Sequence, residues 1–188
     1  MRPTRHLFAP AAAVAALALL APASGAAQSL DVDLFGLVPV PDTSCTIAAV
    51  TDQGGTNTSF TRQSQERSRV DIELVDANGL GRPFSVVLDV AVNCGVAWQA
   101  SITSQNDGLR NNGPTEPVFI NYGVQIPTGA ASSVNLSTTQ GQSPGAQTAT
   151  ADFDAADSNV ELAIAGSPSG SLVPGSYSDT LSLVIRPR

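Results

Sequence analysis

Apolar and polar residues alternate along most of the chain with a period of two, which is the pattern of half-buried β-strands. The clearest run has an apolar residue at every second position from Phe84 to Val92. Cys94 continues the same parity, so its sulfur is predicted to point into the core. A second run consists of Val96, Trp98, Ala100 and Ile102.

Shorter alternating runs predict further strands around Val70–Leu74, Val118–Val124, Val134–Leu136, Val160–Ile164 and Leu181–Ile185. Turn-forming pairs separate the strands: Gly54-Gly55, Asn78-Gly79, Asp107-Gly108, Asn112-Gly113 and Pro174-Gly175. Beyond the N-terminal segment, no window shows a sustained helical period. Several short strands separated by turns predict one all-β domain, an antiparallel β-sandwich.

The stretch from Pro117 to Ala151 contains no charged residue, and its second half is rich in Ser, Thr, Gln and Gly. This composition is compatible with a flexible loop or with a polar hairpin at the edge of a sheet. We favour a loop with short strands.

The first 27 residues have the order of a secretory signal peptide: basic residues, an apolar run from Leu7 to Leu20, then small residues. Cleavage is predicted before Gln28, and Ala21-Pro22-Ala23 offers an alternative site. A membrane anchor is disfavoured because the uninterrupted run is shorter than the ~20 residues that a span needs, and Pro10 lies within it. The protein is therefore expected to be exported.

Removal of this segment changes which chemistry the chain can perform. The remaining chain contains no His, Lys or Met, which excludes Ser–His–Asp, Cys–His and lysine-based catalysis. Seven Arg then stand against 16 acidic residues, a net charge of −9. Such a chain is expected to repel nucleic acid and anionic lipid.

The acidic residues do not form a recognisable catalytic or metal site. Asp71-Ile72-Glu73 is typical of a solvated strand face, and one Trp with two Tyr offers little aromatic surface to a sugar. The group Asp152-Phe153-Asp154 with Asp157 lacks the Gly and the distal Glu of an EF-hand loop. We therefore expect no enzymatic activity, no metal and no cofactor.

The two cysteines are expected to pair, because a disulfide is the default in an oxidising compartment. Cys45 begins an alternating segment that places Ile47 and Ala49 on the cysteine face, and Cys94 also points inward. Closing this loop would stabilise the fold by roughly 4 kcal/mol. A zinc site lacks further ligands, and a redox-active pair is disfavoured because no Cys-x-x-Cys is present.

The mature N-terminus contains a strongly alternating segment. Leu30, Val32 and Leu34 alternate with two aspartates, and the parity continues through Gly36 to Val38 and Val40. Two interpretations remain open: a first strand of the sandwich, or a donor strand that fills a groove in a neighbouring molecule. The pattern alone favours the first.

The C-terminus changes this balance. Residues 175–185 read G-x-Y-x-D-T-L followed by an alternating terminal strand. This ending resembles the spore coat protein U-like domain family, which includes the subunits of archaic chaperone–usher pili. Cys45-Thr46, Val92-Asn93-Cys94 and the segment from Val92 to Asn111 agree with the same family in order along the chain.

The resemblance implies an incomplete immunoglobulin-like sandwich that lacks its final strand. A periplasmic chaperone fills the gap temporarily, and the N-terminal extension of the next subunit then replaces it. The implied arrangement is a signal peptide over 1–27, a donor-strand extension over 28–44 and the sandwich over 45–188. The implied donor residues are Leu30, Val32, Leu34, Val38 and Val40.

The same resemblance assigns roles at the C-terminus. Leu181, Leu183 and Ile185 would line one edge of the acceptor groove and pair with the chaperone, while Tyr177, Asp179 and Thr180 would set how this strand begins. The chain departs from the family at its end, where Pro187 cannot donate a hydrogen bond to a ladder. The segment between Leu34 and Cys45 is also long, and it either links subunits or folds back.

The expected function is that of a structural subunit of a secreted surface fibre, or pilus. Its expected partners are other copies or sister subunits, the periplasmic chaperone and an outer-membrane usher. It would pass through the periplasm to the cell surface. The alternatives are a non-polymerising coat or matrix protein whose own N-terminal strand completes its fold, and a fibre-tip adhesin.

Overall fold

The computed structural model describes residues 28–36, 45–64, 66–111, 117–129, 132–139 and 147–188. Within these ranges all regular secondary structure is β, arranged as two sheets. No helix long and apolar enough to cross a membrane occurs in the described part of the chain. The predicted signal peptide, the Asn112-Gly113 turn, Val38 and Val40 lie outside the described residues.

The larger sheet contains the chain's C-terminal strand near its middle. Its main path runs in the order β11 (Gln147–Phe153), β6 (Trp98–Ser104), β13 (Tyr177–Pro187), β1 (Gln28–Gly36), β4 (Arg67–Ile72) and β3 (Thr58–Arg62). Two short strands, β7 (Leu109–Asn111) and β8 (Phe119–Ile120), extend from the first part of β13.

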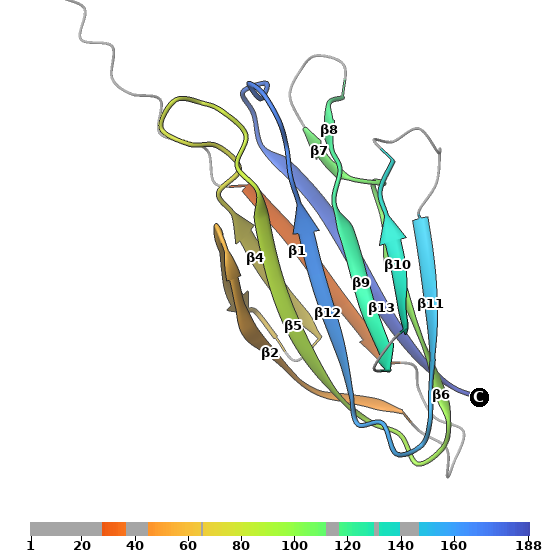
Figure 1. Cartoon of the computed structure of the whole chain (residues 1–188). Helices are drawn as coiled ribbons and strands as arrows, with labels where there is room; N and C mark the ends of the chain where they lie inside the picture. The colour runs from red at the N-terminus through yellow and green to blue at the C-terminus, as the bar shows by residue number, and fades with distance from the viewer. Residues whose placement is uncertain (1–27, 37–44, 65, 112–116, 130–131, 140–146) are drawn as a thin grey trace, which may run out of the picture.

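The smaller sheet is antiparallel throughout. Its order is β10 (Ser132–Ser137), β9 (Gly123–Gly129), β12 (Asn159–Gly166), β5 (Phe84–Asn93) and β2 (Thr46–Thr56). Figure 1 shows the two sheets as facing layers.

Side chains from both sheets form one hydrophobic core. Alternate residues of β5, β6 and β13 are buried, as their sequence parity predicts. Trp98 is fully buried, and its ring stacks on Phe153 with 4.2 Å between ring centroids. The prediction of an all-β fold is confirmed, and two facing sheets around one core are consistent with the predicted sandwich.

The uncharged stretch is more regular than predicted. It contains β9, β10 and most of β11, with β10 and β11 at sheet edges, so polar edge strands replace much of the favoured loop. Strand β3 was not predicted either, because its five residues include only one large apolar side chain, that of Phe60. Edge strands need less apolar surface, and the pattern is correspondingly weaker.

Two predictions about β2 are wrong. Irregular register near Ala48 shifts the parity, so Val50 is buried and Ala49 is only half-buried. The Gly54-Gly55 pair does not form a turn but lies inside β2, beside a second irregularity. The chain passes to the other sheet at Asn57, which has a φ of 55°, a conformation that Asn tolerates better than most residues.

Cys45 and Cys94 form the predicted disulfide. Cys45 immediately precedes β2 and Cys94 immediately follows β5, and both residues are buried. Because β2 and β5 are neighbours in the smaller sheet, the bond fixes the start of the edge strand β2 to the end of β5.

Candidate functional site: a strand slot between β13 and β4

The N-terminal strand β1 lies inside the larger sheet, between β13 and β4 (Figure 1). It pairs with β13 in parallel, from Ser29 beside Ser178 to Gly36 beside Ile185. It pairs with β4 in the antiparallel sense, as far as Asp33 opposite Arg67. We call the space that β1 occupies between these two strands the strand slot. Among the described strand pairs, only β1 with β13 is parallel.

The β13 wall of the slot is the strand that the sequence assigns to the groove edge. Its residues Leu181, Leu183 and Ile185 are buried. The register places Val32 beside Leu181 and Leu34 beside Leu183. The structure therefore brings the predicted donor segment next to the predicted groove edge, within one chain.

Val32 occupies the centre of the slot. Its side chain is fully buried, with Leu181 on one neighbouring strand and Ser68 on the other. For Leu30 and Leu34 the register gives the backbone neighbours, which include Val70 of β4 beside Leu30. The apolar parity of β1 thus coincides with the buried parity of β4, in which Val70 and Ile72 belong to the core.

The β4 wall contains a buried hydroxyl that the sequence analysis did not single out. Ser68 is 1% exposed, and its Oγ has no hydrogen-bond partner among the described residues. A buried polar group without a partner costs about 1–3 kcal/mol. Because Ser68 lies directly opposite Val32, this unfavourable contact is located at the middle of the slot.

The outer face of the slot pairs acidic with basic positions. Asp31 of β1 lies opposite Arg69 of β4, and Asp33 lies opposite Arg67. Arg69 also forms an ion pair with Asp71 on its own strand, with 2.7 Å between Nε and Oδ1. This match requires the cross-strand register, which no local pattern in the sequence provides.

A buried carboxylate fixes the beginning of β13. Asp179 is 1% exposed, and its Oδ2 accepts hydrogen bonds from the hydroxyls of Ser104 and Tyr122, each at 2.5 Å. Its Oδ1 accepts the backbone N–H groups of Asn106 at 2.9 Å and Thr180 at 2.7 Å. These bonds tie β13 to β6 and to the segments on either side of β7 and β8, so the slot wall is held independently of β1.

Two further residues of the C-terminal motif hold the same region. Tyr177 is buried, and its hydroxyl donates to the carbonyl of Val173 at 2.9 Å. Gly175 has a φ of 152°, and a Cβ there would collide with the side chain of Asn111. These contacts support the structural role predicted for Tyr177, Asp179 and Thr180, which stays a prediction.

Burial raises the pKa of Tyr122 well above its ordinary value, and the neighbouring Asp179 carboxylate adds to the shift. Both effects disfavour a phenolate, in the first case because it would lose hydration and in the second because it would face a negative charge. The phenol therefore remains a hydrogen-bond donor to Asp179 over the ordinary pH range.

The acidic group near Asp154 forms a turn. The Asp157 carboxylate accepts the Asp154 backbone N–H at 2.8 Å, and Asp152 pairs with Arg188 at 3.0 Å between Oδ2 and the guanidinium. Among the described residues, no three His, Cys, Asp or Glu side chains are grouped closely enough to hold a metal ion.

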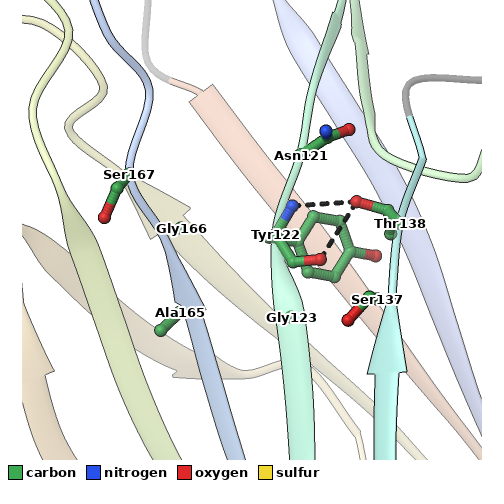
Figure 2. Close-up of a pocket in the computed structure, with 8 residues that line it drawn as sticks. All are labelled: Asn121, Tyr122, Gly123, Ser137, Thr138, Ala165, Gly166 and Ser167. Carbon is green, nitrogen blue, oxygen red and sulfur yellow. Dashed lines mark hydrogen bonds between the residues drawn. The ribbon is translucent and has the colours of Figure 1, made fainter.

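A shallow pocket lies apart from the slot (Figure 2), beside β9, β10 and β12, and has a volume of about 390 Å³. Thr138 Oγ1 both accepts from the backbone N–H of Tyr122 at 2.8 Å and donates to its carbonyl at 3.0 Å. No ionisable side chain other than Tyr122 lines it; the lining residues are Asn121, Tyr122, Gly123, Ser137, Thr138, Ala165, Gly166 and Ser167. This hollow offers little recognition chemistry compared with the slot.

No protein-family model matches the chain, and comparison with curated proteins found no match. Membership of the spore coat protein U-like family therefore stays a prediction from the motifs around Cys45, Cys94 and Tyr177.

Proposed function

We propose that this protein is a structural subunit of a secreted surface fibre, in which each subunit fills the strand slot of a neighbour with its own β1. The observation that supports this most is the position of β1. The segment with donor-like alternation lies in an interior place of the larger sheet, flanked by β13 on one side and β4 on the other.

Without a strand in the slot, the domain would expose unfavourable surface. The buried rows of β13 and β4, including Leu181, Leu183 and Val70, would lose their cover. Two strands would also present unpaired backbone groups, which invite association with another chain. The slot therefore needs an occupant at every stage, and during export a periplasmic chaperone would fill it.

A second copy offers the same nine-residue strand as the chain's own N-terminus. Exchange of identical strands is domain swapping, which needs no new kind of contact. The chain's own strand has the advantage of a higher effective concentration, because it is covalently joined to the domain that contains the slot. Assembly by an usher would offset this advantage, and a head-to-tail exchange that does not close produces a filament.

The finer fold assignment belongs to the same proposal. An immunoglobulin-like sandwich that lacks one strand would obtain it from β1 or from a neighbour, and β13 would be the last strand of the incomplete domain. The family resemblance and the slot support this assignment together.

A second candidate function is favoured by one observation: β1 pairs within its own chain. In that case the protein is a secreted coat or matrix protein of the same type, and its own N-terminal strand completes the fold permanently. The two candidates share the slot and differ in whether β1 leaves it.

Deletion of residues 28–36, with a periplasmic chaperone supplied, separates these candidates. For a fibre subunit we expect the truncated protein to survive bound to the chaperone and to be unable to donate a strand, so ladders of SDS-resistant multimers disappear. Persistence of the ladders would contradict the donor role of β1. An unfolded monomer that no chaperone protects would favour permanent self-completion.

A further inference from the structure

The cross-strand register of the slot matches charges as well as apolar residues. We propose that the strand slot selects its occupant by charge: Arg67 and Arg69 of β4 recognise a strand with acidic residues at the positions of Asp31 and Asp33. The occupant that comes from outside the chain is the Gln28–Gly36 segment of a second copy, and this part of the inference rests on the proposed function.

The residues of β4 alternate between the core and the outer face of the larger sheet. Its residues Ser68, Val70 and Ile72 are buried, whereas Arg67 is exposed and the Arg69 side chain is 38% exposed. The two arginines therefore belong to the outer face of the larger sheet. Residues directly opposite in an antiparallel pair share a face, so the positions of Asp31 and Asp33 belong to that same face.

Only one wall of the slot, β4, bears charge at these positions. On β13 the neighbours of Asp31 and Asp33 are Thr180 and Ser182, which are neutral. Opposite charges directly across an antiparallel pair stabilise it, and like charges destabilise it. The β4 wall is therefore the one that distinguishes an acidic strand from a basic strand.

The chain as a whole carries a net negative charge. The sequence carries 16 acidic residues against nine Arg, so an acidic strand from another copy approaches a surface of its own sign. A local basic pair is what allows such a strand to enter a particular site despite this repulsion. Arg67 and Arg69 provide that pair at the slot itself.

The sequence of β1 is symmetric about Val32. Its central five residues, Leu30-Asp31-Val32-Asp33-Leu34, read the same in both directions. Reversal about Val32 exchanges Asp31 with Asp33, so each arginine still meets an aspartate. The covalent link to β2 restrains the direction in which the chain's own strand enters the slot, whereas a strand from a second copy has no such restraint. The charge match holds for either direction.

The experiment uses full mature chains with reversed charges. We expect D31R/D33R and R67D/R69D each to lower the melting temperature by roughly 5 °C or more, because like charges then meet in the slot. The quadruple variant D31R/D33R/R67D/R69D restores opposite charges and is expected to regain most of the loss. R62D/R110D, which changes two exposed arginines that do not pair with β1, is the matched control and should melt like the wild type.

Mixing gives the second readout. D31R/D33R and R67D/R69D are unfolded together and refolded with the disulfide intact. In each variant β1 meets like charge in the slot of its own chain, and it meets opposite charge only in the slot of the other variant. We expect hetero-oligomers in size-exclusion chromatography that neither variant forms alone.

A quadruple variant that melts no higher than the two double variants would overturn charge selection. Recovery in the quadruple variant without hetero-oligomers in the mixture would uphold charge selection and overturn the exchange between copies, and with it the proposed fibre. If a double variant does not fold, folding of the quadruple variant supports the inference. If the quadruple variant does not fold although D31N/D33N folds, charge selection is contradicted.

Discussion

The first two strands of the described chain, β1 and β2, are held in the domain in different ways. Strand β2 lies at an edge of the smaller sheet, and the Cys45–Cys94 disulfide fixes its start to the end of β5. Strand β1 lies in the interior of the larger sheet, and the described residues hold it by backbone pairing and by burial of Val32. A strand at an edge is thus locked covalently, whereas a strand in the middle is not.

This difference separates the domain into a fixed body, which the disulfide ties together, and the strand β1, which the disulfide does not reach. The disulfide lies at the start of this body, because Cys45 immediately precedes β2. The wall of the slot belongs to the fixed body, since Asp179 and Tyr177 tie the start of β13 to neighbouring segments. A subunit that exchanges one strand and keeps the rest intact needs such a division.

The largest effect is expected from the covalent side of the comparison. The variant C45S/C94S should lower the free energy of unfolding by about 4 kcal/mol, because the unfolded chain regains the entropy of a long loop. Denaturant unfolding measures this value, and chemical reduction of the wild type is the control. A variant within 1 kcal/mol of the wild type would show that the bond does not fix the body.

The next effect concerns the strand itself. V32A should lower the free energy of unfolding by about 2 kcal/mol, because it removes two buried methyl groups and leaves a cavity in the slot. Hydrogen exchange should also show faster opening of β1 amides than of β2 amides. V173A is the matched control, since Val173 is 44% exposed and should change stability by less than about 0.5 kcal/mol. If V32A accelerated hydrogen exchange equally in β1 and β2, this result would contradict the division between the fixed body and β1.

The third test addresses the wall of the slot through pH. The phenol of Tyr122 has a raised pKa in the folded chain, whereas in the unfolded chain it ionises near pH 10. The unfolded state therefore releases a proton first, and stability that is present below pH 10 is lost as the pH rises further. Y122F should lose about 1–2 kcal/mol at neutral pH and should not show this alkaline loss. Identical alkaline curves for both proteins would contradict this assignment.

The smallest effect should be a gain. S68A removes a buried hydroxyl without a partner opposite Val32, so it should raise the free energy of unfolding by about 1 kcal/mol. S104A is the matched control, because the Ser104 hydroxyl donates to Asp179 at 2.5 Å and its removal should destabilise. Destabilisation by S68A equal to that of S104A would show that the Ser68 hydroxyl contributes a favourable contact.

The parts of the fold that could be predicted are those with a local signal. The apolar parity of β5, β6 and β13 predicts their buried faces, and export chemistry predicts the disulfide. The bulges of β2 could not be predicted, because a one-residue shift at Ala48 leaves no mark in composition. Strand β11 does have an alternating buried face, formed by Ala149, Ala151 and Phe153, but two of these three side chains are small, so the apolar signal in the sequence is weak.

The site was predicted in its components and not in its arrangement. The alternation of Leu30, Val32 and Leu34 indicates a strand, but its neighbours depend on contacts distant in sequence. The match of Asp31 to Arg69 and the burial of Ser68 both depend on the register of β1 with β4. Register is set by long-range pairing, which a single sequence does not specify.

Disulfide trapping of β1 against β13 in exported protein tests the strand exchange most directly. D31C/T180C places one cysteine on each strand in the observed register, and D31C/S182C does so for the strand reversed about Val32. The account predicts a ladder of covalent multimers on non-reducing gels for at least one pair, and monomers for each single variant. Monomers alone in both pairs, with an internal cross-link in D31C/T180C, would contradict exchange between subunits and show that β1 stays in its own slot.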